Sequence, residues 1–174
     1  MKRCISLFII CLTLFAAGCK NGSVINLPIK FYYPNATLSY GTQEGLFSNE
    51  LREGSNKTAQ ESISEYLKGP SDHAFSNPFP TKTILLEYEL KDDTAYLILS
   101  DNYAQLTGLD LSIANTCLSM TVLELTGALS VSISCESALL DGQTSVIMNQ
   151  YSALLYDSSK STAPTESVPT PTDK

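Results

Sequence analysis

The sequence predicts an α+β fold, a mostly antiparallel sheet with two helices packed on one face. Short segments in which apolar and polar residues alternate indicate strands, most clearly in residues 84–99. Two segments with apolar residues at helical spacing, residues 58–67 and 111–126, indicate helices. Two helices on one face of a sheet would bury both apolar patterns at once, and the expected order is strand, weaker strand, helix, hairpin, helix and strand.

The first strand and the first helix have local boundary signals. Residues 29–33 place Ile, Phe and Tyr on one face between two prolines, which predicts a strand, and residues 46–52 are a weaker strand candidate. Thr58 and Glu61 fit the T-x-x-E capping box, in which each side chain satisfies an exposed backbone N–H of the other residue. We expect the helix to end at Gly69-Pro70, because glycine tolerates the left-handed conformation and proline cannot continue a helix.

A hairpin follows the first helix. Residues 84–91 alternate with a period of two, and we expect the even-numbered apolar residues to form the buried face and the odd-numbered ones a largely exposed face. Asp92-Asp93 supplies a tight turn, and residues 95–99 return as the partner strand.

A second helix and a further strand complete the expected elements. The helix covers about residues 111–126, with Asp110 as its N-cap and Gly127 as its C-terminal stop. Residues 129–135 alternate apolar residues with serine, which predicts a strand. Residues 146–156 fit a short helix and an irregular closing segment equally well.

Composition divides the chain of 174 residues into four parts. The last part is rich in Ser, Thr and Pro, and such composition cannot repay the entropy of ordering the chain. The domain between the terminal parts is long enough for one substantial core and too short for two. We expect residues 1–18 to be a lipoprotein signal peptide and residues 19–27 the lipidated amino terminus and a polar linker, on the resemblance described next for Cys19. Residues 28–156 are the expected domain, and residues 157–174 are an expected disordered tail.

Cys19 is the residue that we expect to carry lipid. It closes the run LFAAGC, behind the basic pair Lys2-Arg3 and an apolar stretch of about thirteen residues. This arrangement resembles the lipobox of bacterial lipoproteins, whose cysteine receives a diacylglycerol, and acyl chains such as palmitate would tether the protein to the cell membrane outside the cytoplasm. A plain secretory signal is the alternative, since small residues also suit ordinary signal peptidase. A transmembrane helix needs about 20 apolar residues, more than this run contains.

The charge excludes one class of partner. The chain has 11 Lys+Arg and 18 Asp+Glu, a net charge of −7, and removal of residues 1–18 would make it −9. Binding to nucleic acid depends on basic residues that neutralise phosphates, so we expect no nucleic-acid partner. Attraction to anionic lipid also needs basic residues, so the lipid would have to hold the protein at the membrane.

Four local patterns together resemble a known family. In chain order they are the aromatic strand FYYP of residues 31–34, the helix end YLKGP of residues 66–70, the proline and hairpin of residues 79–97, and the helix stop, strand and turn of residues 127–142. In this order, behind a lipobox, they resemble the GerMN domain, named for the sporulation and spore-germination protein GerM. This chain has room for one such domain, whereas GerM resembles a tandem. The resemblance implies an envelope lipoprotein without catalytic residues that acts through protein contacts in sporulation, germination or envelope signalling.

We expect no catalytic, cofactor-binding or metal site. The lone histidine, His73, follows an aspartate on a loop, and no G-x-S-x-G elbow supplies a nucleophile for it to activate. Glu61 and Glu65 lie one helical turn apart, and Glu87 and Glu89 share a strand face, so either pair could flank a sugar bond or bind calcium. A helix cap and solvated charge are the interpretations that we favour for these residues, and no zinc spacing is present.

The two cysteines of the domain, Cys117 and Cys135, allow two interpretations. Cys4 and Cys11 would leave with the signal, and Cys117 and Cys135 remain in the domain. A helix and the strand beneath it would carry them, so outside the cytoplasm they could form a disulfide. Two buried thiols that behave as small apolar side chains are equally natural.

The sequence therefore predicts a membrane-anchored lipoprotein whose domain binds a protein partner in the cell envelope. Loops on a rigid scaffold often carry function, so the exposed side of the sheet and the proline-containing loop of residues 69–82 are the expected contact surfaces. A small cell-wall hydrolase is the alternative from another class, and it needs carboxylates or His73 converging in a cleft. A solute-binding lipoprotein ranks last, because such proteins need two lobes and more residues.

Overall fold

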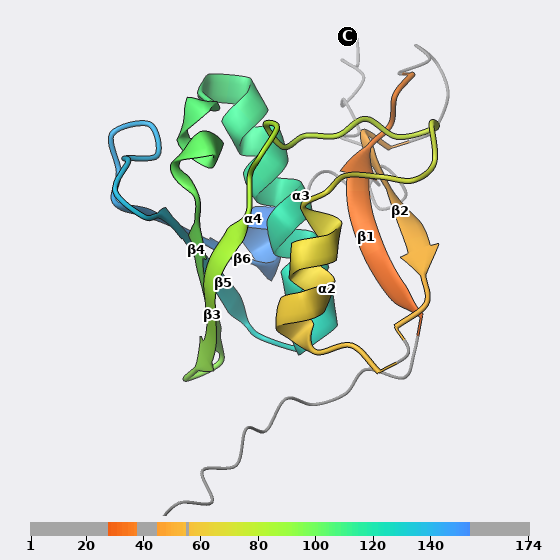
Figure 1. Ribbon diagram of the computed structural model, residues 1–174, viewed down its shortest axis with the longest axis horizontal. Coiled ribbons are helices and arrows are strands. Elements are labelled where there is room, and N and C mark those ends of the chain that lie inside the picture. Colours follow the sequence, from red (N-terminus) through yellow and green to blue (C-terminus); the bar gives the residue numbers. More distant parts are fainter. Residues whose placement is uncertain (1–27, 38–44, 55, 154–174) are drawn as a thin grey trace, which may run out of the picture.

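The computed structural model describes residues 28–37, 45–54 and 56–153 (Figure 1). The expected signal peptide, Cys19, the expected linker and the Ser/Thr/Pro-rich segment at the end of the sequence lie outside these residues. The described elements are, in order, β1 (Ile29–Pro34), β2 (Phe47–Arg52), α2 (Ala59–Tyr66), β3 (Leu85–Lys91), β4 (Thr94–Leu99), the 3-10 helix η2 (Asp101–Gln105), α3 (Gly108–Thr126), β5 (Ser130–Cys135), β6 (Ser145–Asn149) and α4 (Gln150–Ala153).

The α+β class and the expected order of elements are confirmed, but the strands divide between two sheets. β1 and β2 form an antiparallel pair, and the other four strands form a sheet in the order β3-β4-β5-β6. In that sheet β4 and β5 run parallel, while the other neighbours are antiparallel. β4 and β5 run parallel because η2 and α3 connect them. A connection that contains a helix can carry the chain back to the end of the sheet at which the preceding strand began.

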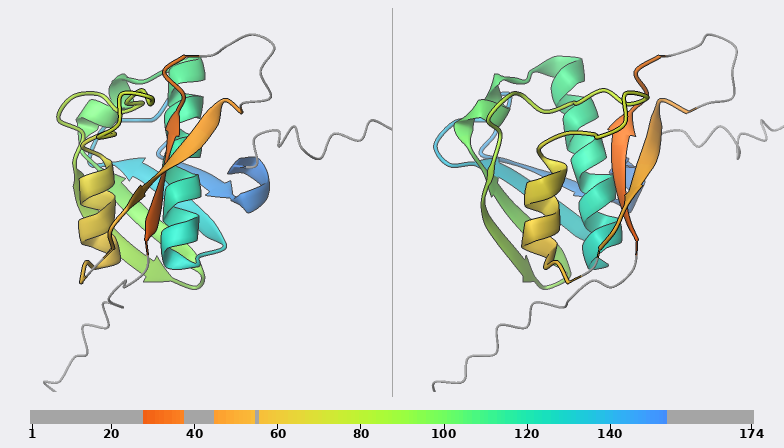
Figure 2. Two further views of the ribbon diagram at one scale, coloured as in Figure 1. Left: turned by 90° about the vertical axis from the view of Figure 1, so that its right-hand side faces the viewer. Right: turned by 45° about the vertical axis from the view of Figure 1, so that its right-hand side comes forward.

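α3 is the centre of the molecule, because it packs between the two sheets (Figure 2). One side of the helix contacts β1, and the other contacts β4, β5 and β6. A helix enclosed in this way is buried around most of its circumference. α2 lies on the same face of the four-stranded sheet and contacts β3, which confirms the prediction of two helices on one face. The buried residues of α3 are Leu111, Ala114, Asn115, Thr116, Cys117, Leu118, Ser119, Thr121 and Val122.

The start of α3 differs from the prediction, and its end agrees. Thr107 is the N-cap in place of Asp110, and the Thr107 side chain makes no capping hydrogen bond. Residue type favoured Asp110 because a carboxylate is among the best capping acceptors, but the helix begins one turn earlier, at Gly108, and its first three residues are exposed. Gly127 ends the helix in the left-handed conformation, with φ +70°, and its N–H donates to the carbonyl of Leu123 at 2.9 Å.

A cluster of aromatic rings joins β1 to both helical regions. Tyr66 of α2 lies at its centre, with ring centroids 5.1 Å from Phe31, 4.9 Å from Tyr33 and 5.1 Å from Phe79. Tyr103 of η2 extends the cluster, 6.4 Å from Phe79. Aromatic side chains bury more apolar area than any others, so this cluster supplies a large part of the energy that holds β1 against α2, η2 and the loop after α2.

The buried tyrosine hydroxyls all have hydrogen-bond partners. The Tyr66 hydroxyl donates to the carbonyl of Tyr32 at 2.6 Å, and the Tyr33 hydroxyl donates to the carbonyl of Tyr66 at 3.0 Å. These two bonds cross-link β1 and α2 in both directions. The Tyr103 hydroxyl donates to Oδ1 of Asn115 on α3 at 2.8 Å. Each phenol is therefore satisfied where water cannot reach it.

α2 begins and ends as its sequence predicts. The Glu61 N–H donates to Thr58 Oγ1 at 3.2 Å, and the Thr58 N–H donates to Oε2 of Glu61 at 2.7 Å, which completes the capping box. Gly69 follows the helix with φ +96°. A Cβ atom there would lie 2.7 Å from the amide nitrogen of the Asn77 side chain, so the position needs glycine for both its conformation and its space.

The hairpin of β3 and β4 is confirmed, but the predicted buried face of β3 is partly wrong. The register shifts between Leu85 and Glu87, which marks a bulge around Leu86. The bulge places Leu85 on the same face as Tyr88, and it leaves Ile84 and Leu86 exposed by 55% and 39%. Simple alternation cannot reveal a bulge, because the extra residue reverses the faces on one side of it only.

The carboxyl-terminal segment is more regular than predicted. Residues 145–149 form β6 and pair with β5, so both alternatives for this part of the chain are wrong. The helical alternative holds only for the single turn of α4, Gln150–Ala153. Residues 47–52 and 130–135 form strands as expected. None of the helices in the described ranges is long and apolar enough to cross a membrane.

The central position of Tyr66 leads to a prediction about stability. Tyr66→Phe should lower the free energy of unfolding by about 1–2 kcal/mol, because the Tyr32 carbonyl loses its donor. Tyr66→Ala should cost about 3–5 kcal/mol through the cavity that it leaves. Urea unfolding followed by circular dichroism measures both, with Tyr151→Phe at a site that is 75% exposed as the control. A Tyr66→Phe protein as stable as the control protein would contradict the cross-linking role.

Candidate functional site

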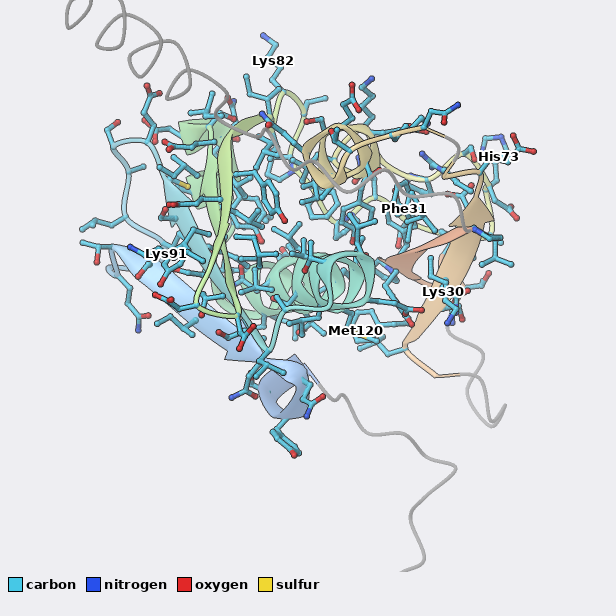
Figure 3. All side chains as sticks on the ribbon, turned by 90° about the horizontal axis from the view of Figure 1, so that it is seen from below. Lys30, Phe31, His73, Lys82, Lys91 and Met120 are labelled. Carbon is cyan, nitrogen blue, oxygen red and sulfur yellow. The ribbon has the colours of Figure 1, made fainter. Side chains whose placement is uncertain are left out.

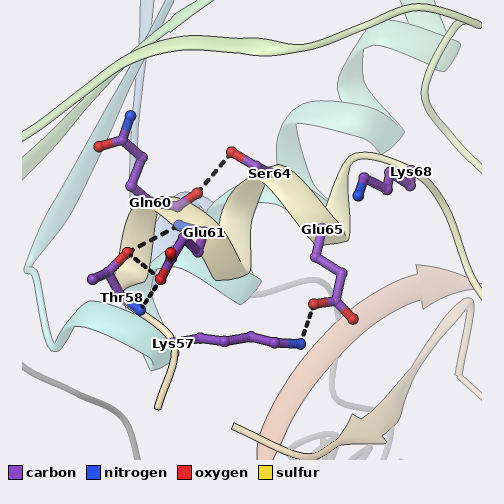
Figure 4. A pocket seen from close by; sticks show the side chains of 7 residues that line it. All are labelled: Lys57, Thr58, Gln60, Glu61, Ser64, Glu65 and Lys68. Atoms are coloured by element: carbon purple, nitrogen blue, oxygen red, sulfur yellow. Dashed lines mark hydrogen bonds and ion pairs between the residues drawn. The ribbon is translucent and has the colours of Figure 1, made fainter. Parts of the chain in front are cut away.

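A pocket lies on the exposed side of α2 (Figure 4). It has a volume of about 560 Å³ and is open to solvent. Glu61 and Glu65, a carboxylate pair that the sequence singled out, both line it. The lining residues are Lys57, Thr58, Gln60, Glu61, Ser64, Glu65 and Lys68. All come from the start and the exposed side of one helix, so the pocket is local to a single element.

Both carboxylates in this pocket are engaged by the chain itself. Glu61 accepts hydrogen bonds from the backbone and side chain of Thr58, and these bonds lower the pKa of its carboxyl. Glu65 accepts a hydrogen bond from Lys57, which lowers the pKa of Glu65, and it also lies 3.6 Å from Nη1 of Arg52. A carboxyl group that acts as a general acid at neutral pH needs a raised pKa, whereas the pKa values of Glu61 and Glu65 are lowered.

A second polar cluster, centred on Arg52 of β2, was not anticipated from the sequence. The Arg52 guanidinium donates to Oε2 of Glu50 at 2.6 Å and to the carbonyl of Gly69 at 2.9 Å, and its carbon lies 5.0 Å from the centroid of the Phe31 ring. Glu50 in turn accepts from the backbone N–H of Ser71 at 3.2 Å. The cluster ties β2 to the turn after α2. Its signal in the sequence is weak, a Glu and an Arg two residues apart on one strand face.

The remaining titratable candidates do not meet. His73 is exposed on the loop after α2, and Figure 3 shows it at the rim of the molecule, on the opposite side from Lys91 at the end of β3. The preceding Asp72 accepts a hydrogen bond from the Ala74 N–H at 2.8 Å, so it shapes the turn. Glu87 and Glu89 are exposed on β3, as the sequence indicated. No group of three metal-ligating side chains occurs among the residues that the structure describes.

Cys117 and Cys135 are free thiols in the structure, and both are buried. Cys117 lies in α3, between the two sheets, and Cys135 lies at the end of β5. Burial raises the pKa of both thiols above the ordinary value of 9.0. A cysteine reacts as its thiolate, so both groups are unreactive at neutral pH.

No helix of the residues that the structure describes covers one face of the four-stranded sheet, and we name this face the outer face. α2 and α3 both lie on the opposite side of the sheet (Figure 2). The strand register places one row of neighbouring side chains across this face, Glu89 of β3, Tyr96 of β4, Ser132 of β5 and Ile147 of β6. The other outer-face residues are Glu87, Lys91, Thr94, Ile98, Ser130, Ser134, Ser145 and Asn149.

The outer face offers polar and apolar contacts without charge over most of its area. Its charged residues are all on β3, at one edge of the sheet. Tyr96 and Ile147 are 43% and 69% exposed; Ser132, which lies between them, is buried, and the hydroxyls of Ser130 and Ser134 are hydrogen-bonded within the sheet. These hydroxyls have no histidine beside them, because the single histidine of the chain is on the loop after α2. The arrangement suits recognition of another surface, with hydrogen bonds and apolar burial together.

The other expected contact surface, the loop of residues 69–82, borders a smaller groove. This groove has a volume of about 290 Å³ and lies between the prolines of the loop and the first turns of α3. Its lining residues are Asn77, Pro78, Phe79, Pro80, Leu106, Asp110 and Ile113. The ring of Phe79 also belongs to the aromatic cluster, so the loop is joined to the core.

Comparisons with known proteins identify a family. The sequence model of the family described as "Germane: Sporulation and spore germination" matches residues 30–141, which is more than half of the chain. No curated protein sequence matches the chain.

Solved structures show a similar fold. The first GerMN domain of the sporulation protein GerM from Bacillus subtilis superposes with a TM-score of 0.52 at 12% identity, over 71% of this chain and 95% of that one. The tandem GerMN domains of the same protein give 0.49 at 16% identity, over 64% of this chain and 39% of the tandem. A Clostridium perfringens protein described as a candidate lipoprotein gives 0.45 at 18% identity, over 76% and 93%. At these identities the likeness to the first GerMN domain concerns the fold alone.

The Lys57–Glu65 pair leads to a prediction about acid stability. The folded-state pKa of Glu65 lies below the ordinary 4.5, so the contribution of the pair is present above about pH 4.5 and is lost as the pH falls through the folded-state value. Glu65→Gln should therefore lower the free energy of unfolding at pH 7 by on the order of 0.5–1 kcal/mol. Between about pH 5 and pH 3 the free energy of unfolding of this variant should fall less than that of the natural protein. Urea midpoints at several pH values measure this effect. Glu87→Gln, at an exposed site, is the control, and identical pH profiles for the two variants would refute the assignment.

Proposed function

Because the chain belongs to the Germane family of sporulation and spore germination proteins, we propose that it is a lipid-anchored envelope protein whose domain binds a protein partner and catalyses no reaction. The observation that carries this proposal is the engagement of both pocket carboxylates, Glu61 and Glu65, by donors of their own chain. The family description names two processes and no reaction. A binding role also agrees with the broad, largely uncharged outer face of the four-stranded sheet.

The proposed anchor is a diacylglycerol on Cys19, supported by the sequence that precedes it. Each buried methylene contributes about 0.8 kcal/mol to membrane binding, and two or more acyl chains hold a protein stably. The net charge of −7 gives the domain no electrostatic attraction to anionic lipid. The protein would therefore work outside the cytoplasm, held at the membrane by its amino terminus.

The outer face and the loop of residues 69–82 are the proposed contact surfaces. The outer face presents Tyr96 between charged β3 and the serines of β5, and tyrosine is enriched at protein interfaces because its ring is apolar and its hydroxyl can hydrogen-bond. The loop lies on the same domain but borders a separate groove, so the two surfaces can be tested independently.

A small cell-wall hydrolase is the second candidate, and the pocket on α2 is the observation in its favour. Paired carboxylates can cleave a glycosidic bond when one is protonated and the other ionised. Glu61 and Glu65 both have lowered pKa values, so neither is suited to donate the proton. Turnover of murein fragments by the purified protein would support the hydrolase and overturn the binding proposal.

The anchor leads to a prediction about localisation. Cys19→Ser should move the protein from the membrane fraction to the soluble fraction, because the acylated thiol is removed. Mass spectrometry of the natural protein should find a diacylglycerol mass on the amino-terminal cysteine. Cys117→Ser is the matched control and should remain in the membrane fraction. An unacylated amino terminus in the natural protein would refute the anchor.

The proposed contact surface leads to a prediction about function in cells. Tyr96→Asp should impair sporulation or germination in the source organism, because it places a negative charge opposite Glu89, beside the uncharged part of the outer face. The double variant Glu61→Gln, Glu65→Gln should retain function, since those carboxylates only stabilise α2. Leu129→Asp, at a 63% exposed site away from the outer face, is the control for an added charge. Loss of function in the glutamate variant alone would favour the hydrolase.

A further inference from the structure

The two edges of the four-stranded sheet differ in how well they resist pairing with another strand. β3, at one edge, carries a bulge and three charged residues, Glu87, Glu89 and Lys91. Bulges and charges are the usual means by which proteins protect an exposed strand edge. β6, at the other edge, carries neither. Within the described residues no strand pairs with the free side of β6.

The surface around β6 is unusually free of charge for this chain. The residues from Ser145 to Ala153, which form β6 and α4, include no Asp, Glu, Lys or Arg, although charged residues make up 17% of the sequence. Ile147 is 69% exposed on β6 and Tyr151 is 75% exposed on α4, which packs beside it. Two copies of an acidic protein repel each other over most of their surfaces, and this edge is a place where they can approach without opposed like charges.

The sequence of β6, SVIMN, is also self-complementary. In an antiparallel pair centred on Ile147, each Ile147 lies opposite its equivalent, Val146 lies opposite Met148, and Ser145 lies opposite Asn149. Apolar residues then meet apolar residues, and polar residues meet polar residues. Val146 already packs against the core on the inner face, so the pairing would continue the core of one copy into that of the next.

We propose that β6 pairs antiparallel with β6 of a second copy of this chain, about a two-fold axis that passes beside Ile147. The backbone groups on the free edge of β6, other than the Asn149 N–H that already donates to Ser152 Oγ at 2.7 Å, would then be hydrogen-bonded, and the two sheets would become one sheet of eight strands. The two outer faces would lie side by side on the same surface. This inference goes beyond the proposed function, because it concerns self-association and requires neither the lipid anchor nor the envelope partner.

A charge-swap experiment tests the two-fold axis directly. Residues on such an axis meet themselves, so Ile147→Lys and Ile147→Glu should each weaken dimerisation at least about tenfold, because like charges then lie directly opposite. An equimolar mixture of the two variants should recover dimers, because Lys then meets Glu. Sedimentation equilibrium of the full chain, solubilised in mild detergent, measures the dissociation constants. Leu129→Lys and Leu129→Glu, at a 63% exposed site, are matched controls that should dimerise like the natural protein.

A cross-link provides a second readout that does not depend on weakened folding. Ile147→Cys in intact cells should give a dimer with a short bismaleimide, and Leu129→Cys should not. The buried thiols of Cys117 and Cys135 have raised pKa values and should not react. A natural protein that sediments only as a monomer, a Lys and Glu mixture that stays monomeric, or a cross-link from residue 147 to a different protein alone would each overturn the proposal.

Discussion

The burial of Tyr66 is the interaction on which the rest of the structure depends. Its ring contacts Phe31 and Tyr33 of β1 and Phe79 of the following loop, and its hydroxyl donates to the backbone of β1. The small β1–β2 sheet has only two strands, and an isolated two-stranded sheet is marginally stable in water. The aromatic cluster attaches this sheet to α2 and α3, and the attachment encloses α3 between the two sheets.

The enclosure of α3 also explains why one face of the larger sheet remains open. Both long helices are needed on the inner side, where β1 covers the far surface of α3. No described helix remains for the outer face, and the β5 positions on that face are serines. A sheet with one packed and one solvated face is ordinary for antiparallel strands. In this chain the solvated face also carries Tyr96 and Ile147, which gives it the mixed character of a binding surface.

Charge in this domain serves mainly to fasten local structure. The carboxylate of Glu61 caps the first turn of α2, that of Glu65 joins the last turn to Lys57, and Arg52 joins β2 to the turn after that helix. These contacts occupy the groups that a hydrolase would need. The acidic surplus of the chain therefore does not converge on a reactive site among the described residues, and its effect is to limit which surfaces can approach another acidic protein.

Local physics let the sequence by itself determine the α+β class, the capping box of Thr58 and Glu61, the ends at Gly69 and Gly127, and most strands. Caps, turns and alternation depend on neighbours a few residues apart, so they can be read without the fold. The division into two sheets, the parallel pairing of β4 with β5, the bulge in β3 and strand β6 depend on contacts between distant segments. The contacts of Arg52 with Gly69 and of Glu50 with Ser71 join residues 17 and 21 positions apart. Only the tertiary structure could reveal that Glu65 is already paired with Lys57 and Arg52. Spacing in the sequence shows which residues share one face of a helix or strand. Which helices and strands pack together depends on the arrangement that buries all of those faces at once.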